Sequence, residues 1–293
     1  MEQALVSCAA ILAIRNEAAY LPALLPGLLD QGIDVVILDN DSSDDSRAIA
    51  RSFASEESLR IEHLPWTGEY DLETVIRTKQ QICNSLSHQW IINIDADEWL
   101  QSPVSGERLR EGITRIDRLG YNAINFDELV FLPLGKTTET NYDFRRENLN
   151  YYFFESFPQR LMRAYRRDAN LSNLDSGGHK LEGDALKLAP EHFILRHYIA
   201  LSQQHIIDKY IGRPFSKNGI ERGWHRNRVG LSAGQLAFPE PRELHQLSHH
   251  DDKEFDRSNA RKTHYWEWQE NKYARGRWHL GEIARSLFKR RKK

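Results

Sequence analysis

Short apolar segments alternate with longer segments of helical spacing along the first hundred residues of the chain. The apolar segments are rich in β-branched residues and predict buried strands at 5–14, 33–38, 59–64 and 90–94. The intervening segments predict helices at 18–29, 44–53 and 71–86. Strands that alternate with helices in this way favour parallel pairing with right-handed crossovers. We therefore expect an α/β fold with a Rossmann-like, mainly parallel sheet flanked by helices.

The strand at 90–94 ends abruptly in three carboxylates, Asp95, Asp97 and Glu98. Its apolar residues favour burial, whereas a carboxylate is not buried without a partner. We therefore expect the three carboxylates at the carboxyl edge of the sheet, where open α/β folds bind ligands. Two carboxylates one residue apart can hold a hard divalent cation there. A solvated strand end is the alternative.

Two further predicted strands end in polar residues, in the sequences Arg15-Asn16-Glu17 and Asp39-Asn40-Asp41. The carboxyl ends of parallel strands meet at one edge of a sheet, so all three polar groups would lie close together. One polar strand end is common in proteins. Three at the same edge favour a binding site over a solvated surface.

Composition narrows the classes of function. The 293 residues are 40% hydrophobic and 28% charged, as in an ordinary globular protein. The formal net charge of −2 gives no basic field for nucleic acid. The two cysteines, Cys8 and Cys83, lie in apolar or helical segments and are expected in or near the core. We find no signal peptide and no apolar run of the roughly 20 residues that span a bilayer, so we expect a cytoplasmic protein.

Several nucleotide and metal motifs can be tested directly against the sequence. Residues 39–50 resemble an EF-hand loop, but Asp44 stands where the turn glycine belongs and Ala50 where the bidentate glutamate belongs. There is no G-x-x-x-x-G-K-[ST] loop, and no G-x-G-x-x-G follows the first predicted strand. No cysteine and histidine spacing indicates structural zinc. The sequence therefore argues against these four common classes of site.

Four blocks resemble the family 2-type glycosyltransferases of the GT-A fold, in order and in spacing: 12–17, 38–46, 77–79 and 94–98. The resemblance is closest to the subgroup whose metal block ends Asp-x-Asp-Glu, and it covers residues from about 5 to 215. It implies a GT-A glycosyltransferase domain over 1–215. We expect residues 216–293 to form a mostly helical C-terminal extension with a basic tail.

The resemblance also implies a nucleotide-sugar donor and a divalent metal, Mn²⁺ or Mg²⁺. Arg15, Asn16 and Glu17 follow the first strand and would lie beside the nucleotide. Asp39 and Asn40 follow the second strand and would contact the base and the ribose. Both groups would then belong to the donor site.

By the same resemblance, Arg77 and Lys79 would lie near the diphosphate, and Asp95 and Asp97 would bind the metal. GT-A enzymes often add a later histidine to this metal site. His197 is the candidate here, and a purely structural histidine is the alternative. The chemistry agrees, because a leaving nucleoside diphosphate develops negative charge that a Lewis acid and cations stabilise.

The sequence leaves the general base open among four residues. In related transferases a carboxylate commonly follows the histidine at position 179, but this chain has Lys180 there. The carboxylates that remain as candidates are Glu182, Asp127 and Glu128. His179 could itself accept the proton, because the ordinary pKa of histidine suits proton transfer near neutrality.

Three later segments allow two interpretations each. The aromatic-rich segment at 142–157 could stack on an acceptor sugar or fill the core. The histidines between 244 and 252 could bind a metal or lie in a solvated loop. The helical spacing at 266–288 leads into a basic tail at 289–293. That tail could contact anionic lipid at the inner face of a membrane, or remain solvated.

Taken together, these features predict an inverting glycosyltransferase that moves a sugar from a nucleotide-sugar to a hydroxyl of a glycan or glycolipid acceptor. We expect no nucleic-acid partner. One alternative is a nucleotidyltransferase that acts on sugar phosphates, although such enzymes usually carry a glycine-rich basic loop where this chain has Arg15-Asn16-Glu17. The other alternative is a catalytically silent nucleotide- or glycan-binding module.

Overall fold

The computed structural model of the chain describes residues 4–54, 58–133, 143–236 and 239–265. Its first half forms four parallel strands in the order β3-β2-β1-β4. Their bounds are Cys8–Ile14 for β1, Asp34–Asp39 for β2, Leu59–His63 for β3 and Trp90–Ile94 for β4. Each lies within a few residues of its predicted position, so the expected α/β fold is confirmed.

Helices cover both faces of these strands. They are α1 (Leu21–Asp30), α2 (Ser46–Phe53), α3 (Leu72–Ser85) and α4 (Leu109–Arg118). Alternate residues of β1 enter two different cores: Ala10 and Leu12 share one with α1 and α4, while Ala9 and Ile11 share the other with α3. Burial on both faces explains why the strand is continuously apolar.

Beyond β4 the sheet is mixed. The later strands are β5 (Glu98–Gln101), β6 (Ala123–Phe131), β7 (Asn150–Phe154), β8 (Leu161–Arg166), β9 (Phe193–His197) and β10 (His245–Gln246). Strand β8 is antiparallel to both β4 and β6, whereas β9 is parallel to β6 and antiparallel to β5. The parallel pairing expected for the whole sheet therefore holds chiefly for its first half.

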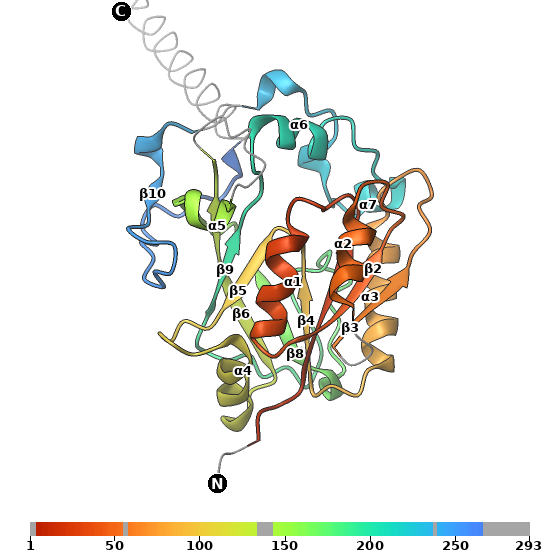
Figure 1. Cartoon of the computed structure of the whole chain (residues 1–293), viewed down its shortest axis with the longest axis vertical. Coiled ribbons are helices and arrows are strands. Elements are labelled where there is room, and N and C mark those ends of the chain that lie inside the picture. Colours follow the sequence, from red (N-terminus) through yellow and green to blue (C-terminus); the bar gives the residue numbers. More distant parts are fainter. Residues whose placement is uncertain (1–3, 55–57, 134–142, 237–238, 266–293) are drawn as a thin grey trace, which may run out of the picture.

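The remaining helices are short: α5 (Phe144–Glu147), α6 (Gln203–Tyr210) and α7 (Lys217–Glu221). Single 3-10 turns occupy 167–169, 226–228, 233–235 and 241–243. Figure 1 shows α6 above the parallel strands and the N-terminus at the opposite end of the molecule. The helix α6 therefore lies beyond the carboxyl ends of the strands, where the sequence predicts a site.

The structure bears on two of the later segments. Tyr151, Tyr152 and Phe153 are buried in β7 and fill the interior, whereas Phe154, also buried, lies at the lining of a cavity. Over its described part, the extension from residue 216 contains one five-residue α-helix, three 3-10 turns and the two-residue strand β10, joined by irregular structure. The predicted helix and basic tail from residue 266 onward lie outside the described residues.

Both cysteines are free and buried, as expected. Burial raises the pKa of the Cys8 thiol to about 12, far from the range of a reactive cysteine. Within the described ranges, no helix has the length and apolar character needed to cross a membrane.

Candidate active site

A cavity of about 480 Å³ opens at the carboxyl ends of β1, β2 and β4. The structure brings nine of the fourteen predicted site residues to its lining: Arg15, Glu17, Asn40, Lys79, Asp95, Asp97, Glu128, His179 and His197. These residues come from segments more than 180 positions apart, so only folding brings them together around one cavity. The cavity lies at the edge of the sheet where the sequence predicts a ligand site.

Asp97 is a buried strand-end carboxylate, with a side chain only 7% exposed. Its Oδ2 lies 3.0 Å from Nζ of Lys209 and 3.2 Å from Nε2 of His197. Burial alone would raise the pKa of Asp97, but the charges of Lys209 and His197 lower it well below its usual range. Asp97 is therefore a carboxylate held ionised by two cationic partners.

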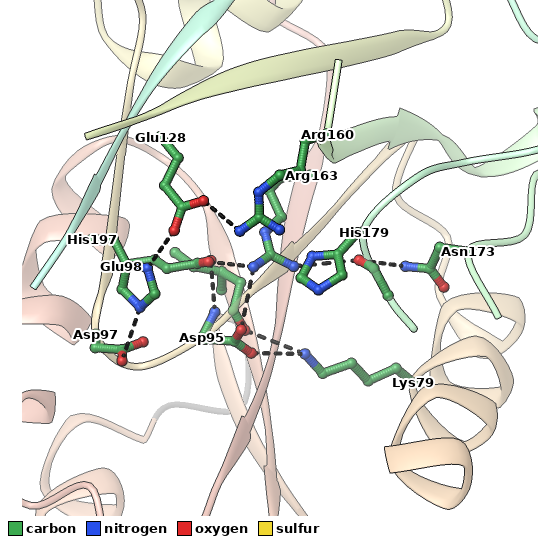
Figure 2. Close-up of polar contacts among 12 residues, drawn as sticks. Lys79, Asp95, Asp97, Glu98, Glu128, Arg160, Arg163, Asn173, His179 and His197 are labelled. Atoms are coloured by element: carbon green, nitrogen blue, oxygen red, sulfur yellow. Dashed lines mark hydrogen bonds and ion pairs between the residues drawn. The ribbon is translucent and has the colours of Figure 1, made fainter. Parts of the chain in front are cut away.

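His197 lies between two carboxylates, as Figure 2 shows. Its Nδ1 lies 2.7 Å from Oε1 of Glu128, and its Nε2 faces Asp97. An ionised carboxylate only accepts hydrogen bonds, so both ring nitrogens donate to their carboxylates in this arrangement, and His197 orients Asp97. A metal-ligating histidine likewise donates one ring N–H to a carboxylate, as Nδ1 does to Glu128, so the role of His197 as a metal ligand stays a prediction.

Asp95 differs from Asp97 in its surroundings. Its side chain is 54% exposed and faces the cavity, 3.8 Å from Nζ of Lys79 and 3.3 Å from Arg163. Arg163 also pairs with Glu98, which is buried and accepts a hydrogen bond from the backbone N–H of Asp95. Asp95 therefore presents an accessible carboxylate to the cavity, while Glu98 holds its backbone N–H in place.

A test of the donor atoms shows which of the predicted residues fit a divalent metal. Mn²⁺ and Mg²⁺ prefer carboxylate oxygens, and Asp95 and Asp97 both direct carboxylates to the cavity. The Nε2 atom of His197 lies beside Asp97, so its place as a third ligand stays a prediction. The residues present therefore fit a cation held by two carboxylates, with its other positions left for ligand oxygens.

His179 follows two glycines, as the sequence shows, and the structure explains why they are needed. Gly177 and Gly178 both have positive φ angles, and a Cβ on Gly177 would lie 2.8 Å from the indole nitrogen of Trp224. The turn thus lets Trp224 pack closely beside His179. The Nδ1 atom of His179 is buried without a hydrogen-bond partner.

The His179 ring is neutral at neutral pH. Burial lowers its pKa well below the usual range, and the nearby charges of Arg160 and Arg163 lower it further. A neutral imidazole beside a cavity can accept a proton. Figure 2 shows the ring next to Arg163, on the side of the cavity opposite Asp97.

The structure leaves five predicted site residues outside the cavity lining: Asn16, Asp39, Arg77, Asp127 and Glu182. Asp39 is buried and pairs with Arg47, whereas Arg77 pairs with Glu73 on the outer side of α3. Glu182 is exposed, and Asn16 bonds to Ser43. These side chains support local structure, because their partners belong to the surrounding loops and helices.

Sequence reasoning missed several residues of the lining, chiefly Arg160, Arg163 and Lys209. Arg160 pairs with Glu128, and Arg163 with Glu98, both inside the protein. The available signal was the short segment 158–163, in which Arg160 and Arg163 flank the apolar residues Leu161 and Met162, since a buried arginine requires a carboxylate partner. The sequence could not name those partners, which lie 32 and 65 positions away.

Asp127 belongs to a separate ion-pair group at the surface. Its Oδ1 lies 2.8 Å from Nδ1 of His192, and its Oδ2 accepts from Arg257 at 2.7 Å. Burial alone would raise the pKa of Asp127, but His192 and Arg257 lower it. The hydrogen bond to Asp127 raises the pKa of His192.

These two shifts predict how an Asp127→Asn variant loses stability with pH. The lowered pKa of Asp127 stabilises the folded protein, and this stabilisation is lost as pH falls below about 4. The raised pKa of His192 also stabilises the folded protein, but this stabilisation is lost as pH rises above about 6.5. Urea unfolding should therefore show a larger difference between wild type and Asp127→Asn at pH 5.5 than at pH 8. Glu182→Gln, an exposed charge removal, should show no such trend. An equal or larger difference at pH 8 would contradict the pairing.

Comparison with known proteins adds independent observations. The model of the family described as glycosyl transferase family 2 matches residues 9–171, more than half of the chain. None of the curated proteins searched matches this chain.

The solved structures that match do so at low sequence identity. S. aureus TarS is 12% identical, with a TM-score of 0.39, over 72% of this chain and 41% of that one. TarS 1–349 in complex with UDP-GlcNAc is 11% identical, with a TM-score of 0.38, over 65% of this chain and 58% of that one. Glucosyl-3-phosphoglycerate synthase from Mycobacterium tuberculosis, in complex with Mn²⁺, UDP and glucosyl-3-phosphoglycerate, is 14% identical, with a TM-score of 0.29, over 43% of this chain and 44% of that one.

The chain spans about two fifths of the length of the first of these structures. The matched family segment contains β1 to β4, the carboxylates Asp95 and Asp97, and the strand that carries Arg163. On the family match, the chain belongs to glycosyl transferase family 2.

Proposed function

We propose that this enzyme transfers a glycosyl group from a nucleotide-sugar to a hydroxyl of a glycan or glycolipid acceptor, with inversion at the anomeric carbon. The observation that carries the proposal is the pair Asp95 and Asp97 at a strand end, in a cavity that also contains Lys79, Arg163 and Lys209. Such an arrangement suits a ligand whose phosphates develop negative charge as the sugar leaves.

The nucleotide would lie along the ends of β1 and β2. Arg15 donates to the backbone oxygens of Asn40 and Asp41, both at 2.6 Å, and its guanidinium lies 3.8 Å over the ring of Trp66. These contacts hold the loop after β2 against the loop after β1. The lining residues Arg15, Glu17 and Asn40 would then contact the nucleoside, whereas Asn16 and Asp39 would act by shaping the two loops.

Asp95 and Asp97 are the residues proposed to hold Mn²⁺ or Mg²⁺. The metal would supply a Lewis acid for the diphosphate. Lys209 and His197 keep Asp97 ionised and oriented. Lys79, with its Nζ 3.8 Å from Asp95, would add positive charge on the opposite side of the same phosphates.

His179 is the proposed general base. Inversion in one displacement requires a group that removes the proton from the acceptor hydroxyl. Among the four candidates, Glu182 and Asp127 lie outside the lining, and both oxygens of Glu128 are engaged by Arg160 and His197. His179 retains an unpartnered Nδ1, and the negative charge of a bound diphosphate would raise its pKa toward the working range.

The proposal is tested by combining turnover with binding. Purified full-length protein is incubated with a panel of nucleotide-sugars, with Mn²⁺ or with EDTA, and release of nucleoside diphosphate and thermal unfolding are measured. A donor at 100 times its Kd should add about 2.7 kcal/mol of stability. We expect one nucleotide to stabilise the protein in a metal-dependent way that Asp95→Ala abolishes.

Two results would count against the proposal. No stabilisation and no nucleoside diphosphate release with any member of the panel would refute the nucleotide-sugar donor. A product with retained anomeric configuration, determined by proton NMR, would refute the single displacement and the role of His179 in it.

A further inference from the structure

Two parts of the chain with different charge build the cavity. Residues within the family segment supply five carboxylates and four cations to the lining: Glu17, Asp95, Asp97, Glu98, Glu128, Arg15, Lys79, Arg160 and Arg163. Among the described residues beyond 171, the lining gains four cations and no carboxylate: Lys209, Arg213, Arg228 and Lys262. The later part therefore gives a nearly balanced cavity an excess of positive charge, which favours a ligand with more than one negative charge.

Arg213 differs from four of the other cations of the cavity. Lys79, Arg160, Arg163 and Lys209 each lie within 4 Å of a carboxylate. The described residues place no carboxylate that close to Arg213, whose guanidinium lies 4.3 Å over the ring of Tyr70. Stacking on an aromatic ring holds a guanidinium in place and leaves its N–H edge available to an anion.

The segment that carries Arg213 is held at both ends. We call residues 209–228 the cationic wall. Its first part is joined to Tyr70, whose N–H donates to the oxygen of Pro214 at 2.8 Å and whose oxygen accepts from the N–H of Ser216 at 3.1 Å. Its later part is held by Trp224, which packs against Gly177. The wall is thus ordered before a ligand binds, which reduces the entropic cost of binding.

A second polar group of the cationic wall also lacks a partner. His225 lies at the cavity, stacked on Phe215 at a centroid distance of 4.8 Å, and its Nε2 is buried without a hydrogen bond. Burial lowers the pKa of His225 to about 3, with the charges of Arg228 and Arg213 acting in the same direction. The ring is therefore neutral, and a ligand would satisfy its buried nitrogen.

Arg213 and His225 of the wall line the same cavity as Asp95, the carboxylate at which the donor phosphates are proposed to lie. Both Tyr70 and His225 are close enough to Asp95 for its charge to act on their pKa values. An anion bound between Asp95 and Arg213 would thus contact the guanidinium of Arg213 and a metal held by Asp95.

We propose that the cationic wall forms the second half of the diphosphate site, with Arg213 in direct contact with the donor phosphates and His225 hydrogen-bonded beside it. The inference rests on the proposed nucleotide-sugar donor. It assigns part of donor binding to a segment that lies wholly outside the matched family region.

Inorganic pyrophosphate, titrated by calorimetry in EDTA, is the probe that tests this site without metal and without a sugar. We expect Arg213→Gln to weaken pyrophosphate binding about tenfold or more, because a hydrogen bond to a charged group is lost. Arg222→Gln is the matched control, because Arg222 lies in the same wall but pairs with Glu73 at 3.3 Å and does not line the cavity. This control should bind pyrophosphate as the wild type does.

Wild-type affinity in Arg213→Gln, or no pyrophosphate binding by the wild type, would overturn the inference. Circular dichroism melting verifies that the variant is folded. If it is not, Arg213→Lys replaces it, because lysine keeps the charge but loses the planar fork, and an undiminished affinity there would equally overturn the contact. If Arg213→Gln binds pyrophosphate weakly while the wild type turns over no nucleotide-sugar, the anion site stands and the proposed function fails.

Discussion

Asp97→Ala will lower the free energy of unfolding by about 1.5–3 kcal/mol, because two buried cations each lose a charged hydrogen-bond partner. Each keeps one other carboxylate, Glu17 for Lys209 and Glu128 for His197. The side chains of Lys209 and His197 are 12% and 14% exposed, so water cannot replace the lost partner fully. The same variant will lose activity, since the proposed metal loses one of its two carboxylates. Urea unfolding and donor turnover measure the two effects separately.

Asp95→Ala is the control that separates stability from chemistry. Its side chain is half exposed, and Arg163 keeps Glu98 as a partner when Asp95 is removed. We expect its stability to change by less than about 1 kcal/mol, as for an exposed ion pair, while activity falls as far as in Asp97→Ala. An equal loss of unfolding free energy in both variants would contradict the idea that Asp97 is the more important of the two carboxylates for stability.

His179→Ala will reduce kcat by about 10²–10⁴-fold if the imidazole accepts the proton of the acceptor hydroxyl. The unpartnered Nδ1 makes no hydrogen bond that the fold would lose, so the melting temperature and the affinity for donor should change little. Steady-state kinetics with a fixed donor and a varied acceptor gives the effect on kcat and on KM.

Lys180→Ala is the neighbouring control for this experiment. Lys180 is exposed and occupies the position at which related enzymes commonly carry a carboxylate. Its replacement should leave kcat near the wild-type value. A His179→Ala variant with unchanged kcat would exclude the imidazole and return the role of base to another residue of the cavity.

Family membership bears on the choice among the three functions that the sequence allowed. The family 2 match favours a glycosyltransferase over a nucleotidyltransferase, and the turnover experiment separates an active enzyme from a silent binding module. The donor nucleotide, the acceptor and the metal remain the subject of the experiments proposed above.

The early strands and helices could be predicted from local sequence because their causes are local. Trp90–Ile94 is apolar throughout and is followed at once by carboxylates, so burial and solvation set the end of the strand within one residue. The helix α3 begins after Asp71, whose side chain accepts from the N–H of Thr74, as a capping residue does. Asp95 and Asp97 were found for the same reason, since a strand end is a feature of a few adjacent residues.

The later strands depended on distant partners, and there local sequence was a weaker guide. The strand β8 can bury Arg163 only because the carboxylate of Glu98 forms an ion pair with its guanidinium. From the sequence, the aromatic residues of β7 could belong either to a sugar platform or to a core. Pairing with β6 on one side and β10 on the other places β7 within the sheet, where these residues are buried. The histidine-rich segment likewise brings His249, His250 and Asp251 within 4.8 Å of one another at the surface, outside the cavity lining.

The alternation of apolar and polar residues along this chain was enough to establish an α/β sheet, its carboxyl edge and the two carboxylates at the centre of the site. Which charges meet those carboxylates depended on folding, because ion pairs join residues that share no local pattern. Lys209 lies 112 positions from Asp97, and His197 lies 69 from Glu128. The spacing of apolar residues predicts whether a side chain faces water or the core. Which buried charges pair with one another depends on the packed structure alone.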